Sequence, residues 1–194
     1  ADAGAVSCVG INDVDASQHA VSQLADGGRK RIAMINHDLS YKYARLRERG
    51  YKSVIHLRDL DYQAVEYASE LSPGAGMAAM QNLLKANPPD AVFAVSDTLA
   101  AGALRAIQQA GLRVPEDIAV VGFDGTELAE MISLTTIEQP SRDIGRKAVN
   151  LLLNKIDNPD APTERVMMDW RFISRASTTI MAVSTIRKTL TAWV

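Results

Sequence analysis

Residues 90–124 decide the fold, because their sequence, DAVFAVSDTLAAGALRAIQQAGLRVPEDIAVVGFD, contains one complete strand–helix–strand unit. The runs at 91–95 and 118–123 are short and almost wholly apolar, as expected of parallel strands that are covered on both faces. Between them, Ser96 and Asp97 offer an N-cap to an amphipathic helix that a glycine ends. The pattern predicts a βαβ unit of an α/β fold.

An aspartate follows each of the two predicted strands, Asp97 after the first and Asp124 after the second. In open parallel sheets, ligands bind outside the carboxyl ends of the strands. We therefore expect both carboxylates to face one crevice. The spacing fits a plainer interpretation equally well, in which Asp97 only caps a helix and Asp124 only closes a turn.

The rest of the chain continues the alternation of strands and helices, with no short-period repeat and no low-complexity segment. Apolar or β-branched runs predict further strands at residues 6–11, 31–35, 63–68, 134–138 and within 165–173. Apolar positions at helical spacing predict helices that end at Gly27, cover 41–57, begin at Ser72 and Pro73, and cover 126–132 and 141–156, the last capped by Ser141.

The composition limits the classes of protein that the chain can represent. Of its 194 residues, 47% are hydrophobic, which suffices to bury a sizeable core in one or two domains. The formal net charge of -2 argues against a strong nucleic-acid footprint, since phosphate binding needs clustered positive charge. Cys8 is the one cysteine, which rules out an internal disulfide and a cysteine-based zinc site and favours a buried structural thiol.

The sequence shows no targeting signal, so a cytoplasmic protein is the default expectation. No run approaches the ~20 apolar residues of a membrane span, and no charged start followed by an apolar segment marks a signal peptide. A start that had lost its first residues would also have lost any export signal.

Three segments together carry a resemblance to a known family: VFAVSDTLAAGALRAIQQAGLRVPEDIAVVGFDGTELA, then LTTIEQPSRDIGRKAVNLLL, then WRFISRAST. They resemble the C-terminal effector-binding portion of lac repressor type (LacI/GalR) transcription regulators. Similarity continues upstream through VGINDVDASQHAVSQLADGGRKRIAMI and RLRERGYKSV, and so covers roughly residues 5–178. The resemblance implies a periplasmic-binding-protein-like (type I) α/β fold, with parallel sheets flanked by helices in two similar subdomains and the effector in the cleft between them.

The resemblance also implies a division of the chain. Residues 1–60 are predicted to be a partial, truncated N-terminal subdomain, and residues 61–178 mostly the C-terminal subdomain, with a crossover segment near 134–150. Residues 179–194 form a tail whose apolar residues recur at helical spacing, which is typical of an amphipathic helix. A fortuitous or disordered extension is the alternative interpretation of this tail. Family members begin with a helix-turn-helix head, and this chain starts after it, so DNA binding is expected only through a head absent from this chain.

Four candidate ligand-binding residues follow from the resemblance. Arg47 lies in RERGY and matches the family's Arg-x-x-Gly-aromatic motif, whose guanidinium donates a rigid fork of hydrogen bonds to hydroxyls or a carboxylate. Asp124 matches the Gly-aromatic-Asp motif, Asp97 the aspartate of an Asn-Asp pair, and Gln139 a polar cleft position near the crossover. Carboxylates accept two hydrogen bonds from adjacent hydroxyls, which suits polyol recognition.

Departures from the family pattern leave the class of effector open. Ser96 stands where many relatives have asparagine, and Leu71 stands about where relatives place an aromatic ring against a sugar or base. Tyr41 and Tyr43 replace small polar residues, and either supply that missing aromatic face or serve only in packing. Residues 12–13 invert the family's common Asp-Asn order. Ser96, Tyr41 and Tyr43 therefore join the candidate ligand-binding residues.

The predicted function is an effector-binding and dimerisation module of a transcription regulator, which acts as a repressor on DNA and is not an enzyme. It is expected to bind a small sugar-like or nucleoside-like effector, to form a homodimer, and to use no cofactor, metal or membrane. An alternative is the periplasmic sugar-binding protein of a transporter, which shares the fold; an upstream helix-turn-helix would exclude it.

A nucleotide-dependent enzyme is the second alternative. Residues 74–79 read GxGxxA after a predicted strand and at the start of a helix, with Asp97 near the spacing of a ribose-binding acid. Ser72 and Pro73 explain the same glycines as a helix start, and no catalytic acid/base pair, nucleophile arrangement or metal-ligand spacing accompanies them.

Overall fold

The computed structural model describes residues 6–178, so the predicted tail at 179–194 lies outside the described residues. Six strands form one sheet in the order β3-β2-β4-β5-β6-β8. Neighbouring strands are parallel except β8, which runs antiparallel to β6. Their bounds are β2 Ile32–Asn36, β3 Ala64–Tyr67, β4 Ala91–Ala94, β5 Ala119–Asp124, β6 Thr135–Glu138 and β8 Arg171–Ile173.

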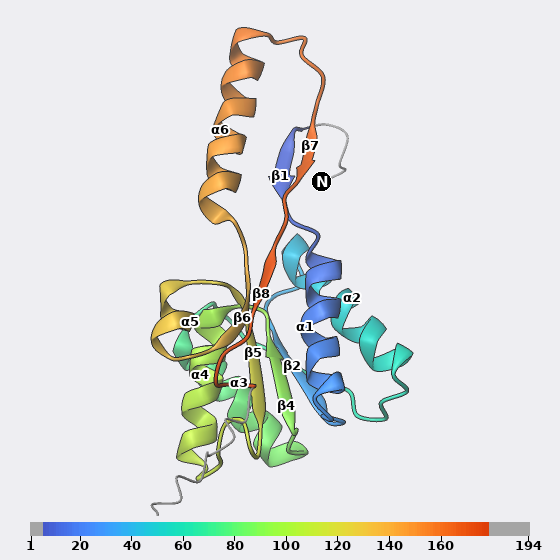
Figure 1. Cartoon of the computed structure of the whole chain (residues 1–194), viewed down its shortest axis with the longest axis vertical. Coiled ribbons are helices and arrows are strands. Elements are labelled where there is room, and N and C mark those ends of the chain that lie inside the picture. Colours follow the sequence, from blue (N-terminus) through green and yellow to red (C-terminus); the bar gives the residue numbers. More distant parts are fainter. Residues whose placement is uncertain (1–5, 179–194) are drawn as a thin grey trace, which may run out of the picture.

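Helices cover both faces of this sheet, as a parallel sheet requires. Figure 1 shows α1 and α2 on one side of the sheet, and α3, α4 and the short α5 on the other. Strands β2 and β4 are buried at every position, which explains their nearly continuous apolar sequence. The helices span α1 Asp13–Asp26, α2 Lys42–Leu57, α3 Pro73–Ala86, α4 Asp97–Gln109 and α5 Glu127–Met131.

A smaller lobe stands beyond the carboxyl end of the large sheet. It consists of the parallel pair β1 (Cys8–Gly10) and β7 (Arg165–Met167), with α6 (Ser141–Asp157) packed beside β1. Figure 1 shows the chain passing between the two lobes three times: from β1 to α1, from β6 to α6, and from β7 to β8. The first and third of these passages are joined by a hydrogen bond of 2.8 Å from the Met168 amide to the Gly10 carbonyl.

The lobes do not divide at residue 60 as predicted from the sequence. Residues 13–60 build the large sheet and its helices, because β2 pairs in parallel with β3 on one side and with β4 on the other. Of the residues described before position 60, only those around β1 belong to the smaller lobe, which is completed by α6 and β7. The crossover from β6 to α6 does fall within the predicted segment 134–150.

The predicted helix starts are confirmed at two of three positions. The Ser96 hydroxyl accepts a hydrogen bond from the Leu99 amide, and Ser72 caps α3 in the same way. Ser141 is instead the first residue of α6, and the N-cap position is held by Pro140, which makes no side-chain cap. Cys8 is half-buried in β1, not fully buried as predicted, because it lies in a two-stranded sheet.

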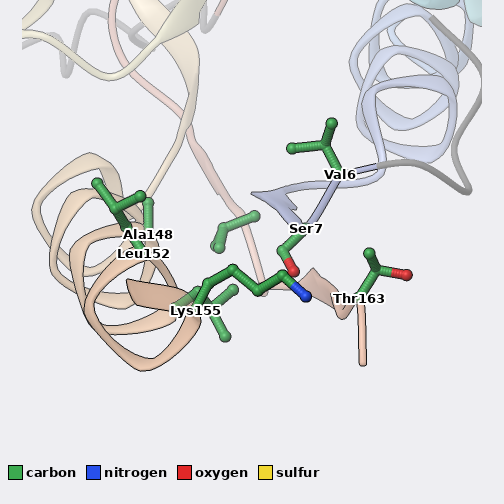
Figure 2. Close-up of a pocket in the computed structure, with 8 residues that line it drawn as sticks. Val6, Ser7, Ala148, Leu152, Lys155 and Thr163 are labelled. Carbon is green, nitrogen blue, oxygen red and sulfur yellow. The ribbon is translucent and has the colours of Figure 1, made fainter. Parts of the chain in front are cut away.

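One side of α6 is covered by β1, and the neighbouring side is exposed. Figure 2 shows a groove between α6 and the residues just before β1, where Ala148 and Leu152 of α6 face Val6 and Ser7 and the Lys155 side chain reaches across. The groove encloses about 180 Å³. Leu152 is 60% exposed, because a sheet of two strands covers only a narrow strip of the helix.

Candidate functional site

The centre of the site is Arg47, a buried arginine on α2 whose guanidinium lies at the carboxyl ends of β4 and β5. Its Nε donates to Asp13 Oδ1 at 2.8 Å, and its Nη1 donates to the Val95 carbonyl at 2.6 Å and to Asp124 Oδ1 at 3.4 Å. The guanidinium carbon lies 3.5 Å from the centre of the Phe123 ring, a cation–π distance. These contacts fix the fork of donors in one orientation.

Asp124 ends β5 and faces Arg47 across the crevice. It accepts a hydrogen bond of 2.8 Å from the Gln139 side chain, which lies on the passage from β6 to α6. Burial raises the pKa of Asp124 to about 6; Arg47 acts to lower it, and the nearby Asp97 to raise it. A carboxylate whose charged form is disfavoured by burial, in a crevice with an arginine, is typical of a binding site.

The backbone of Asp124 is strained. Its φ is 118°, a conformation that side chains other than glycine rarely adopt. Such strain persists where the surrounding structure holds the residue in place, and it concentrates at functional sites. The strained backbone is therefore a second, independent indication that Asp124 serves binding.

Asp97 does not line the crevice as predicted. It is fully buried, and its carboxylate accepts hydrogen bonds from the Thr126 amide at 2.7 Å, the Thr126 hydroxyl at 2.9 Å and the Thr136 hydroxyl at 2.6 Å. Burial raises its pKa, while these hydrogen bonds act to lower it. The absence of a side chain at Gly122 leaves room for the carboxylate. Asp97 thus links Thr126, in the loop after β5, to Thr136 of β6, and in this way helps to fix the end of β5, where Asp124 lies. Ser96 is likewise buried, and serves as the cap of α4.

Tyr41 and Tyr43 belong to an aromatic cluster that continues the site along the carboxyl end of β2. The buried His37 ring stacks on Tyr41, with ring centres 4.9 Å apart, and its Nδ1 shares a hydrogen bond of 2.7 Å with the Tyr43 hydroxyl. The Arg47 guanidinium carbon lies 5.0 Å from the centre of the Tyr43 ring. Burial raises the pKa of Tyr43. The structure thus brings both tyrosines to the same crevice as Arg47.

Three polar residues near the site were missed by the sequence analysis. Asp13 lies in the inverted pair at 12–13, and His37 follows a strand that ends at the crevice; both signals were present in the sequence. Glu48, next to Arg47 in RERGY, was missed because two of its partners, Asn36 and Tyr67, come from other elements.

The buried Glu48 holds the ends of β2 and β3 together. It accepts hydrogen bonds from Asn36 at 2.8 Å and from Tyr67 at 3.1 Å, and pairs with Lys52 at 2.5 Å. Burial acts to raise the pKa of Glu48, but the bonds from Lys52, Asn36 and Tyr67 bring it below its ordinary value. The Asn36 side chain in turn accepts a hydrogen bond of 2.8 Å from the His37 amide, so this network fixes the backbone where the segment carrying His37 and Tyr41 begins.

An open hollow of about 780 Å³ adjoins Asp124 and Gln139. Its other walls are mostly polar and charged, and include Arg142 in the first turn of α6, Asp169 on the passage from β7 to β8, and Arg171 at the start of β8. A cavity of this size and polarity accommodates a small hydrophilic molecule. The site therefore supplies hydrogen bonds and charge, and it supplies them next to the segments that join the lobes.

Residues 6–178 contain no group of three or more His, Cys, Asp or Glu side chains arranged to hold a metal ion. No helix in this described range is long and apolar enough to cross a membrane. Within the GxGxxA segment, Gly76 packs directly against the backbone of Leu99 on α4, so its lack of a side chain serves helix packing.

Comparison with known proteins identifies the family of this fold. A family model described as the periplasmic binding protein-like domain matches residues 21–178. Over 164 residues the chain is 36% identical to the ribose operon repressor of Haemophilus influenzae, covering 81% of this chain and 49% of that protein. The chain thus spans about half the length of the curated relatives it matches.

Two solved structures are similar throughout most of the chain. One is the transcriptional regulator CelR in complex with cellobiose, with 33% identity and a TM-score of 0.84 over 89% of this chain and 54% of that one. The other is a LacI family transcriptional regulator from Enterococcus faecium with bound ribose, with 28% identity and a TM-score of 0.82 over 88% of this chain and 65% of that one. The chain belongs to the periplasmic binding protein-like family, in the form found in LacI-type transcription regulators.

Proposed function

We propose that the chain is the effector-binding and dimerisation module of a transcriptional repressor, and that it performs no catalysis. The observation that carries the proposal is the buried Arg47 fork, which lies against Asp124 at the carboxyl ends of two parallel strands. Sugar-like and nucleoside-like molecules offer the adjacent hydroxyls that such a pair of charged groups recognises. The relatives support this chemistry, since one holds cellobiose and another ribose.

The position of the site next to the inter-lobe passages suggests how binding is transmitted. Gln139 lies on the passage from β6 to α6 and donates to Asp124, while Asp13 directly follows the passage from β1 and accepts from Arg47. A ligand that engages Arg47 and Asp124 therefore alters contacts of two passages, and favours one lobe arrangement if it binds that arrangement more tightly. In the proposal, the resulting change reaches DNA-binding heads of a homodimer.

The two alternatives are less well supported. The relatives named above are repressors and regulators, which favours a regulator over a transporter's binding protein. The glycines that resembled a nucleotide-binding loop are explained by the Ser72 cap and by the packing of α3 on α4. A regulator acts on the chromosome, so a cytoplasmic location is part of the proposal.

A calorimetric screen of pentoses, hexoses, disaccharides and nucleosides tests the proposal on the protein as its gene encodes it. A binding ligand should then change the affinity of the same protein for operator DNA in a gel-shift titration. Conversion of a ligand into product, or binding that leaves DNA affinity unchanged, would contradict the proposal.

Effector affinity should fall when the pH is lowered from about 7.5 to about 5. Burial raises the pKa of Asp124 from an ordinary 3.8 to about 6, whereas ligand hydroxyls donate best to the charged carboxylate. Binding below pH 6 must therefore remove a proton from Asp124, which costs about tenfold in affinity for each pH unit. Calorimetry across this range measures the effect.

Asp124→Asn is the control, since it keeps the shape of the side chain and cannot titrate; its weaker binding should be independent of pH.

The stability of the folded chain depends on pH in the opposite direction to effector affinity. Because the pKa of Asp124 is higher in the folded chain, its contribution to stability is full below about pH 4 and is lost as the pH rises through about 6. A wild-type affinity that is constant over the range would contradict the contact between Asp124 and the ligand.

A further inference from the structure

The aromatic shelf, defined as His37, Tyr41 and Tyr43, lies directly beside the polar part of the site. Tyr43 is the link between the two parts: the Arg47 guanidinium carbon lies 5.0 Å from its ring centre, and the Tyr41 ring centre lies 5.7 Å from it on the shelf. The site therefore has a charged part at Arg47 and Asp124, and an aromatic part that begins at Tyr43 and continues to Tyr41.

The exposed member of the shelf is Tyr41. Its side chain is 51% exposed, although it lies at the N-cap position of α2, where a side chain usually bonds the helix amides. Tyr41 makes no such bond. One side of its ring is packed on His37, and the exposed remainder is available to a ligand. A tyrosine that neither caps its helix nor fills the core has a surface fit for stacking.

The other two members hold this surface in place. His37 is buried, stacks on Tyr41 with an interplanar angle of 25°, and is nearly parallel to the Tyr43 ring at 11°. Its hydrogen bond to the Tyr43 hydroxyl fixes the orientation of both rings. His37 is thus a positioning residue, and the shelf is organised before a ligand arrives.

The chemistry of the shelf restricts what it can hold. It offers flat aromatic faces, and the Tyr43 hydroxyl already shares a hydrogen bond with His37, so what the shelf mainly presents is a surface for stacking. A nucleobase needs only a face on which to stack, and base–aromatic stacking tolerates every base. A single sugar ring that binds Arg47 and Asp124 would leave the exposed face of Tyr41 unused.

We infer that the effector is a nucleoside, whose ribose hydroxyls bind Arg47 and Asp124 and whose base stacks on Tyr41. The inference rests on the proposed function and names the class of ligand for the same site. Ribose alone uses the charged part of the site and leaves the shelf empty. A nucleoside therefore binds more tightly than ribose, and Tyr41 is the residue that sets the difference.

Calorimetric titrations with adenosine, uridine, D-ribose and cellobiose test the inference on the protein as its gene encodes it. At least one nucleoside should bind about tenfold to a hundredfold more tightly than ribose, the gain expected from one stacked base. Tyr41→Leu should abolish this advantage without changing the affinity for ribose, and Tyr41→Phe should keep it. Leu39→Ala, in the same loop, is the control and should leave every affinity unchanged.

The outcomes separate the inference from the proposed function. If ribose or cellobiose binds and neither nucleoside does, or if Tyr41→Leu leaves nucleoside affinity unchanged in a folded protein, the base site is wrong and the effector site stands. If neither nucleoside nor either sugar binds, the inference is overturned. If a nucleoside binds through Tyr41 but its affinity is unchanged by Arg47→Ala and Asp124→Ala, the proposed effector site at these two residues is wrong.

Discussion

Replacing Arg47 or Asp124 with alanine should weaken effector binding by about 1.5 to 3 kcal/mol in each case, the range for hydrogen bonds to charged groups. Each change removes one of the two charged groups that face each other at 3.4 Å in the crevice, and the ligand cannot replace it. Isothermal titration with the ligand found by screening measures the loss, and thermal unfolding shows whether the fold is retained.

Two companion variants make this prediction specific. Glu130→Ala, on α5 six residues beyond Asp124, changes an exposed carboxylate that does not line the hollow, and should alter binding little. Asp124→Gly removes the carboxylate from a backbone with a φ of 118° that glycine adopts freely, so stability should be retained or should rise while binding is lost. A ligand whose affinity is untouched by both alanine changes would show that Asp124 is only a turn residue.

The sequence predicts the elements of the fold well because each is set by local chemistry. Apolar runs such as 91–95 and 118–123 become buried parallel strands, and Ser72 and Ser96 cap helices as their positions indicate. The lobe boundary could not be predicted in this way. It depends on the pairing of β2 with β4, between residues far apart in the chain, for which neither strand carries a local signal.

The site was predicted only as far as backbone position determines it. Residues at the ends of parallel strands meet at one edge, which is why Asp124 and Gln139 come together with Arg47. Asp97 also ends such a segment, yet its side chain turns inward, because two threonine hydroxyls and the space at Gly122 receive it. The direction of a side chain depends on partners from other strands, and spacing along the chain does not specify it.

Gly76→Ala should destabilise the protein by about 3 kcal/mol, whereas Gly74→Ala, two residues earlier in the same motif, should not. A Cβ at position 76 would lie 2.3 Å from the carbonyl oxygen of Leu99 on α4, and backbone atoms cannot move aside as a side chain can. The helices cannot separate easily, since Gly102 of α4 is packed equally closely against Pro73. Overpacking a core costs typically 1–3 kcal/mol, and the contact with backbone places this change near the upper end.

At position 74 the nearest atom to a new Cβ would be the Ser72 hydroxyl at 3.7 Å, an ordinary contact. Alanine there should stabilise the protein by about 0.4–1 kcal/mol, because it restricts the unfolded chain and suits a helix better than glycine. Urea unfolding of the two variants measures the difference. Equal stabilities would mean that Gly76 is not needed for the packing of α3 on α4. The interpretation of Gly76 as a packing residue would then be wrong, and with it the argument against a nucleotide-binding loop.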